Sequence, residues 1–226
     1  MQTETRDITR LAAEFAAVHP DLDRSMQRLA LALFRLLSEG KPVRPEDLAE
    51  RLRLPATDVA SDLERLPMVQ RDESGRVVAY AGLTLKPTSH VLEVDGRHLY
   101  TWCSLDTLFI PELLGRLARV CSTSPETGET ISLTVDASGV RDVLPERAVM
   151  TLHDIAGFDL KDVVGTFCCY VHFFASEEAA RAWAQRSEGT YVASIAEGFE
   201  YGRLYNHAQL GAALEEAARS DGKKKL

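Results

Sequence analysis

Residues 90–106, which read HVLEVDGRHLYTWCSLD, carry the strongest structural signals in the chain. His90–Val94 and His98–Trp102 are typical of short β-strands, and Asp95-Gly96 between them is a strong hairpin signal. Cys103 follows the second strand directly, and residues 104–117 are predicted to be helical. This stretch therefore predicts strands and a helix close together around one cysteine.

Strand and helix patterns alternate after this stretch. Ile131, Leu133 and Val135 occupy every second position, as in a half-buried strand. Ser176 followed by two glutamates is typical of a helix start, where an oxygen caps free N–H groups and acids face the positive helix end. The predicted elements are strands at Val120–Ser124, Glu129–Val135, Gly165–Phe174 and Tyr191–Ile195, and helices from Ser176 to about Arg186 and over residues 196–219.

The residues before this stretch are mostly helical by pattern. Two amphipathic helices are followed by a short helix–turn–helix segment and then by a hairpin that turns at residues 72–75. The predicted elements are helices at residues 1–18, 24–38, 44–51 and 56–66, and strands at Met68–Arg71 and Arg76–Leu83. Helices that end in such a hairpin form a winged-helix pattern.

The whole pattern predicts an α+β fold. We expect a winged-helix-like helical region over residues 1–86, then a mixed core of short, mainly antiparallel strands with flanking helices over residues 87–219. Residues 220–226 are predicted to form a disordered tail.

The bulk composition narrows the class of protein. The chain has 226 residues, of which 45% are hydrophobic, so it can bury a core, and its formal net charge is −8. Such a charge argues against general binding to nucleic acid or to an anionic membrane. No apolar run is long enough to span a membrane, and the first ten residues do not resemble a signal peptide. We therefore expect a cytoplasmic protein whose four cysteines are reduced thiols.

A winged helix can read DNA, but the charges of this one disfavour that function. Residues 24–86 contain 11 basic and 9 acidic side chains, so they form no basic footprint. The helix that would enter the major groove, residues 56–66, has three acidic side chains and one arginine. Phosphates would repel such a helix, and we expect the module to pack against the rest of the chain or to cover its site.

Cys103 and Asp106 are the first candidate site residues. Backbone N–H groups at a helix start favour negative charge, which lowers the pKa of a thiol. Asp106 lies three residues after Cys103, so one helical turn returns its carboxylate to the same side. The alternative is that Asp106 only caps the helix and Cys103 is a small core residue, and the spacing alone favours this alternative.

Cys168 and Cys169 form the second candidate segment. On a strand, neighbouring side chains point to opposite faces. Cys169, Val171 and Phe173 would form an apolar core face, and Cys168 would lie on the more polar face with Tyr170 and His172. This interpretation favours Cys168 as the site residue, whereas His172 is either a ligand or base or, more commonly, a structural hydrogen-bond partner.

Several other site types are not supported by the sequence. There is no C-x-x-C motif, no cysteine and histidine spacing of structural zinc sites, no glycine-rich phosphate loop and no G-x-S-x-G motif. A cysteine-hydrolase dyad of Cys103 with His90, His98 or His172 remains open.

The two cysteine segments resemble the organomercurial (alkylmercury) lyases. The resemblance runs through RHLYTWCSLDTL at 97–108 and FCCYVHFFAS at 167–176, with weaker similarity at GKPV (40–43) and YAGLTL (80–85), and it spans most of residues 24–210. It implies that Cys103 and Cys168 are the catalytic cysteines and mercury ligands, and that Asp106 is the acid–base residue. Two departures are Cys121, which stands three residues before the position of a further family cysteine, and Tyr170, which replaces a histidine.

The resemblance implies protonolytic cleavage of a carbon–mercury bond in mercury detoxification. Mercury is a soft cation that prefers thiolates, and a nearby carboxyl group can pass a thiol proton to the leaving carbon. The expected substrate is R–Hg⁺, no organic cofactor is required, and small thiols or a mercuric reductase would accept Hg²⁺. The alternatives are a non-catalytic thiol-based metal-responsive winged-helix regulator and a relative that only sequesters metal. Asp106 favours the enzyme over the regulator, because a sensor needs no proton shuttle.

Overall fold

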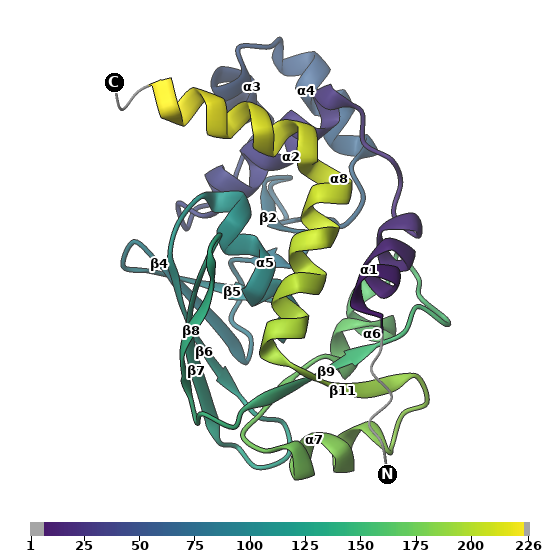
Figure 1. Cartoon of the computed structure of the whole chain (residues 1–226). Helices are drawn as coiled ribbons and strands as arrows, with labels where there is room; N and C mark the ends of the chain where they lie inside the picture. Colours follow the sequence, from purple (N-terminus) through teal and green to yellow (C-terminus); the bar gives the residue numbers. More distant parts are fainter. Residues whose placement is uncertain (1–6, 224–226) are drawn as a thin grey trace.

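The computed structural model describes residues 7–223 and confirms the predicted α+β class (Figure 1). The amino-terminal part is helical, as predicted, and residues 1–6 of the predicted first helix lie outside the described residues. Asp7 and Asp23 cap the first two helices, and the Asp23 carboxylate accepts the N–H groups of Ser25 and Met26, both at 2.9 Å. These helices are α1 (Ile8–Ala17), α2 (Arg24–Leu37), α3 (Pro45–Leu52) and α4 (Ala56–Arg65).

An antiparallel sheet begins in this helical region and continues far beyond it. Within the described residues it has eight strands in the order β1-β2-β3-β5-β4-β6-β7-β8. The predicted hairpin around Asp95-Gly96 is confirmed as β4 and β5. The strands are β1 (Val69–Arg71), β2 (Val77–Tyr80), β3 (Leu83–Thr84), β4 (His90–Val94), β5 (Arg97–Thr101), β6 (Ala118–Thr123), β7 (Thr130–Asp136) and β8 (Gly139–Leu144).

The sheet crosses the predicted boundary between residues 86 and 87. β3 pairs with β5, where Leu83 faces Thr101 and Thr84 faces Tyr100. The predicted strand at Arg76–Leu83 is two strands, because Ala81 and Gly82 have positive φ angles of 42° and 99° and turn the chain between them. The division into domains 1–86 and 87–219 stays a prediction, and hydrogen bonds of the sheet join the two parts.

A second, smaller sheet has the order β10-β9-β11 in the described part of the chain. Of its strands, β9 was not predicted, and neither was β8 of the large sheet. Two further helices, α5 and α7, flank the sheets. The bounds are β9 (Val149–His153), β10 (Phe173–Phe174) and β11 (Thr190–Ser194), with α5 (Ser104–Leu114) and α7 (Glu177–Ala184).

The predicted strand at Gly165–Phe174 is wrong. Its residues form the end of a short helix, α6 (Val163–Thr166), a 3₁₀ turn, η1 (Cys168–Tyr170), and only then β10. Asp162 caps α6 by accepting the Gly165 N–H at 3.0 Å. These local hydrogen bonds outweigh the strand preference of the aromatic and β-branched residues that follow.

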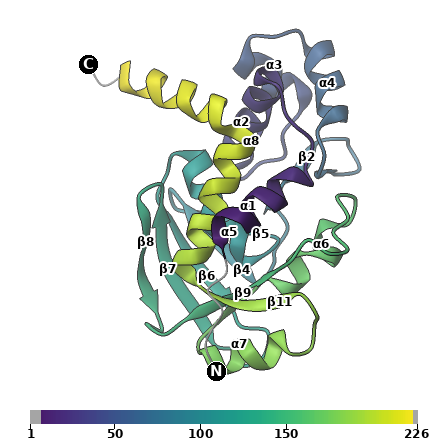
Figure 2. The same cartoon turned by 45° about the vertical axis from the view of Figure 1, so that its right-hand side comes forward.

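The last element is the long helix α8 (Ile195–Lys223), which runs past both α5 and α1 (Figures 1 and 2). Gly202 permits close packing on α5, since a Cβ atom there would lie 2.7 Å from Phe109 Cβ. Part of the predicted tail at 220–226 overlaps this helix, and residues 224–226 lie outside the described residues. None of the helices described in residues 7–223 is long and apolar enough to cross a membrane.

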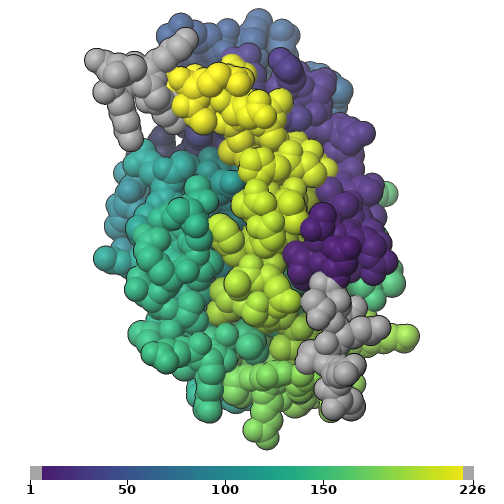
Figure 3. Space-filling model, in the orientation of Figure 1, coloured from purple at the N-terminus to yellow at the C-terminus, as the bar shows by residue number. Residues whose placement is uncertain are grey.

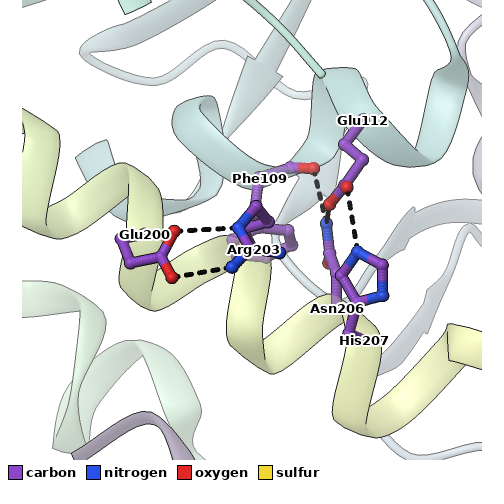
Figure 4. A network of polar contacts seen from close by, with 6 residues as sticks. All are labelled: Phe109, Glu112, Glu200, Arg203, Asn206 and His207. Atoms are coloured by element: carbon purple, nitrogen blue, oxygen red, sulfur yellow. Dashed lines mark hydrogen bonds and ion pairs between the residues drawn. The ribbon is translucent and has the colours of Figure 1, made fainter. Parts of the chain in front are cut away.

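Polar contacts fix α8 against α5 (Figure 4). Asn206 on α8 donates from Nδ2 to the Phe109 carbonyl at 2.9 Å and to the Glu112 carboxylate at 2.7 Å. His207 approaches the same carboxylate at 3.4 Å. The space-filling view shows α8 as a band between the strands of the large sheet and α1 (Figure 3). The core thus lies beneath α8, where α5 meets the sheet.

Candidate active site

Cys103 lies at the junction between β5 and α5. It is the N-cap residue of α5, and its N–H donates to Asp106 Oδ2 at 2.8 Å. The N–H of Asp106 points back to the Cys103 side chain, so the two residues form a reciprocal capping box. Asp106 therefore caps α5, as the alternative interpretation of the sequence predicted. The same bond also holds its carboxylate beside the thiol.

Cys168 lies in the η1 turn, which is tied to two other segments. Thr151 on β9 donates from its hydroxyl to the Tyr170 carbonyl at 2.7 Å and accepts the His172 N–H at 3.1 Å. The N–H of Ser104, next to Cys103, donates to the Val171 carbonyl at 3.3 Å. These bonds bring the Cys168 turn to the start of α5.

The structure brings the three predicted site residues together. One ligand atom of each of Cys103, Asp106 and Cys168 lies within 4.8 Å of the others, and within residues 7–223 this is the cluster of cysteine and acidic side chains that could hold a metal ion. All three are buried, with exposed fractions of 0%, 7% and 3% respectively. Two sulfur atoms and a carboxylate oxygen suit a soft thiophilic metal.

Burial shifts the pKa of Asp106 far from its ordinary value. Desolvation raises this pKa from 3.8 to about 7, although hydrogen bonds from the Cys103 N–H and thiol oppose the shift. A carboxyl group with such a pKa can both accept and donate a proton near neutral pH.

The thiols are more basic than the sequence suggested. Burial raises the pKa of Cys103 well above its ordinary value, and donation of its proton to Cys168 and the charge of Asp106 raise it further. The hydrogen bond from Cys103 lowers the pKa of Cys168, but burial, Asp106 and Cys169 outweigh it. The expectation that the helix start lowers the pKa of Cys103 is therefore wrong, because desolvation exceeds the effect of one N–H group.

Gly82 limits the space around Asp106, a contact that sequence reasoning missed. A Cβ atom at Gly82 would lie 2.5 Å from the carboxyl carbon of Asp106. The Gly82 carbonyl accepts the Trp102 N–H at 2.9 Å, which fixes this turn beside the site. The glycine in YAGLTL was the available sequence signal, but it does not reveal the contact with Asp106.

Among the described residues, the remaining cysteines and the histidines do not belong to the cluster of Cys103, Asp106 and Cys168. Cys121 and Cys169 are exposed, and so is His98. His90 contacts the Ser122 hydroxyl at 3.0 Å, and His172 contacts the Cys169 carbonyl at 2.9 Å. These partners agree with a structural role for both rings and do not support a cysteine–histidine dyad.

Comparisons with known proteins identify the family of this chain. The sequence model of the alkylmercury lyase (MerB) family matches residues 83–206. Alkylmercury lyases from Staphylococcus epidermidis and Bacillus cereus are 41% and 38% identical to this chain, over 88% and 98% of both sequences. One from Pseudomonas putida is 41% identical over 85% of this chain and 88% of its own length.

A solved structure supports the same fold. It is the crystal structure of the mercury-bound form of MerB2, with a TM-score of 0.72 over 89% of this chain and 98% of that one. Its sequence identity is 21%, so this likeness concerns the fold alone. The family match covers more than half of the chain, and the sequence relatives match most of it. The chain therefore belongs to the alkylmercury lyase family.

Proposed function

We propose that Cys103, Cys168 and Asp106 carry out the reaction of this family in the present chain. The protein is an alkylmercury lyase, an enzyme that cleaves the carbon–mercury bond. In our proposal both sulfurs bind the mercury of R–Hg⁺, and the carboxyl group of Asp106 transfers a proton to the leaving carbon. The observation that carries this assignment is the buried cluster of two thiols and one carboxyl group within 4.8 Å.

The proposed reaction balances without a cofactor. One thiol loses its proton to the medium as its sulfur bonds to mercury. The other thiol gives its proton to Asp106, and its sulfur forms a second bond to mercury. The protonated Asp106 then donates to carbon as the Hg–C bond breaks. R–Hg⁺ and two thiols thus give R–H, mercury held by two thiolates, and one proton.

The pKa of Asp106 fits this double role. At a pKa of about 7, the carboxylate is available to accept a proton at neutral pH, and its conjugate acid is strong enough to donate. Mercury lowers the pKa of a coordinated thiol, so the high pKa values of the free thiols do not prevent deprotonation on binding. Without substrate, the two thiols therefore keep their protons, and binding of mercury releases them.

Release of Hg²⁺ needs a competing ligand. We propose small thiols or a mercuric reductase as acceptors, in the reducing cytoplasm where such thiols are abundant. Transfer of Hg²⁺ is expected to pass through a complex in which thiolates of the protein and of the acceptor both bind the metal. Two buried thiolates bind mercury too tightly to release it unaided.

Benzene release from phenylmercury in the presence of excess thiol tests the assignment. Cys103→Ser, Cys168→Ser and Asp106→Ala should each lower turnover by at least about a thousandfold, because each removes a mercury ligand or the proton donor. Asp106→Ala should spare mercury binding more than turnover. Cys121→Ser, at an exposed position on β6, is the matched control and should keep full activity.

Full activity in any of the three variants would remove that residue from the proposal. Cys169→Ser should retain most activity, since its thiol is exposed and lies outside the cluster. If wild-type protein binds mercury but releases no hydrocarbon, the chain only sequesters the metal.

A further inference from the structure

The two site thiols form a buried pair whose geometry suits a second class of ligand, an inference that rests on the proposed function for the roles of Cys103 and Cys168. The Cys103 thiol is hydrogen-bonded to the sulfur of Cys168. Both sulfurs lie within 4.8 Å of each other and of a carboxyl oxygen of Asp106, and both side chains are buried. The site therefore holds two thiols in contact with each other and shielded from water.

Cys169 does not form a similar pair with Cys168, although the two residues are neighbours in the chain. In the η1 turn the side chain of Cys168 is buried and that of Cys169 is exposed. The Cys169 thiol donates to the Gly165 carbonyl at 3.1 Å. Cys121 on β6 is exposed as well. Within residues 7–223, the buried dithiol thus consists of Cys103 and Cys168.

Trivalent arsenic suits two thiols that already contact each other. Like mercury, it is soft and prefers sulfur ligands. Its three bonds lie on one side of the atom, because a lone pair occupies the fourth direction, so two sulfurs bonded to it lie close together. Two sulfurs on linear Hg²⁺ lie on opposite sides of the metal instead. The resting positions of Cys103 and Cys168 therefore need little change to bind arsenic.

The number of thiols selects the class of arsenical. An arsenic(III) atom with one organic group has two further bonds, which two thiols fill. Arsenite has three such bonds, and in the described part of the chain no third cysteine belongs to the cluster. A disubstituted arsenical has only one. The monosubstituted compound, R–As(OH)₂, is also uncharged at neutral pH, so its transfer into a buried site costs less than that of an ion.

We propose that this site binds monosubstituted trivalent arsenicals, R–As(OH)₂, through Cys103 and Cys168, and that bound arsenical blocks the cleavage of organomercurials. Two As–O bonds break and two As–S bonds form. Each hydroxide leaves with one thiol proton, so R–As(OH)₂ and two thiols give R–As bound to both sulfurs and two molecules of water. Arsenic stays trivalent, and no oxidant or reductant takes part. Both thiol protons leave in water, so none passes through Asp106 to carbon, and the carbon–arsenic bond remains.

Phenylarsine oxide, which forms phenylarsonous acid in water, is the probe for this proposal. Non-denaturing mass spectrometry without added thiol should show one phenylarsenic group per chain in place of two thiol hydrogens. Single-turnover release of methane from methylmercury should stop as the site fills. Cys103→Ser and Cys168→Ser should each weaken binding at least about a hundredfold, because only one As–S bond then holds the ligand. Cys121→Ser and Cys169→Ser, the matched controls at exposed positions, should bind it like wild type.

A comparison of ligands on the wild-type chain keeps the test valid where a cysteine variant does not fold. Monomethylarsonous acid should bind at least about a hundredfold more tightly than dimethylarsinous acid, which forms a single As–S bond. Equal affinities for these two compounds would overturn the inference. Loss of binding in Cys169→Ser with full binding in Cys103→Ser would also overturn it, because the arsenical would then bridge the neighbouring cysteines.

Further outcomes separate this inference from the proposed function. If the wild-type chain releases methane from methylmercury but does not bind phenylarsine oxide, the inference fails and the proposed function stands. Benzene release from the phenylarsenic complex would contradict the stated persistence of the carbon–arsenic bond. If the wild-type chain binds the arsenical through Cys103 and Cys168 but releases no methane, the buried dithiol is confirmed and the proposed function fails.

Discussion

At the scale of single residues, the site depends on the carboxyl group of Asp106, whose ionisation is opposed by burial. The family resemblance implies Cys103 and Asp106 as site residues, whereas their spacing alone favours a helix cap and a core residue. Neither signal predicts the shift in the pKa of Asp106, because that shift results from burial by distant segments. Asp106 is surrounded by residues of the β2–β3 turn, α5 and α8. Its chemistry is therefore a property of the fold and not of the motif alone.

This burial predicts how stability depends on pH. The folded protein retains the Asp106 proton up to about pH 7, whereas an exposed carboxyl group releases it near 3.8. The folded state is thus destabilised as pH rises from about 4 to 7, by up to roughly 4 kcal/mol for a shift of this size. Asp106→Asn should raise the free energy of unfolding at pH 8 and leave it nearly unchanged at pH 4. Urea denaturation at both pH values measures this, and an equal effect at both would contradict the shift.

Gly82 gives a second prediction at this scale. Gly82→Ala places a methyl group against the Asp106 carboxyl and should displace it, which lowers turnover about a hundredfold. Binding of Hg²⁺ by the two thiols should persist. Gly96→Ala is the control, since Gly96 also has a positive φ but has open space around it. Similar losses in both variants would show that backbone strain, and not the contact with Asp106, is responsible.

At the scale of elements, the sequence predicts most helices and the β4–β5 hairpin, because caps and turn residues are local signals. It fails where tertiary contacts decide. The segment at Gly165–Phe174 was predicted as a strand, and alternation on that strand selected Cys168 over Cys169. The segment is a 3₁₀ turn, and its burial reverses the predicted faces, because Cys169, predicted to lie in the core, is exposed and Cys168 is buried. Successive side chains of such a turn point in different directions, so only one of the two cysteines faces the buried cluster.

The η1 turn depends on Thr151, which gives a prediction for this scale. Thr151→Val keeps the shape of the side chain but leaves the Tyr170 carbonyl and the His172 N–H without their hydroxyl partner. We expect a loss of about 1–3 kcal/mol in stability and lower turnover through displacement of Cys168. Thr134→Val on β7 is the control and should have little effect on either measurement. If the variant is fully folded under the assay conditions and its turnover is unchanged, the turn holds its shape without Thr151.

At the scale of the whole molecule, the winged-helix-like region is joined to the rest by one sheet. β3 belongs to the first part and pairs with β5, which leads directly to Cys103. The composition argued against a basic DNA-binding surface, which stays a prediction, and it could not reveal that Gly82 of this region faces Asp106. Only the folded chain shows that residues before the predicted boundary complete the site.

This continuity predicts that the second part does not function alone. A fragment of residues 87–226 lacks β3 and the turn against Asp106, so β5 would have an open edge. We expect no cooperative unfolding transition and no hydrocarbon release from this fragment, measured by circular dichroism and gas chromatography. A folded, active fragment would instead support two independent domains.

The burial of the two site thiols has a consequence for oxidative stress. Oxidants such as peroxide react with exposed thiolates, and Cys103 and Cys168 are both buried and held as thiols by their raised pKa values. Cys121 and Cys169 are exposed and meet such oxidants first. The sulfurs that we propose to bind mercury thus stay in the reduced state that mercury requires, and damage is directed to sulfurs outside the proposed site.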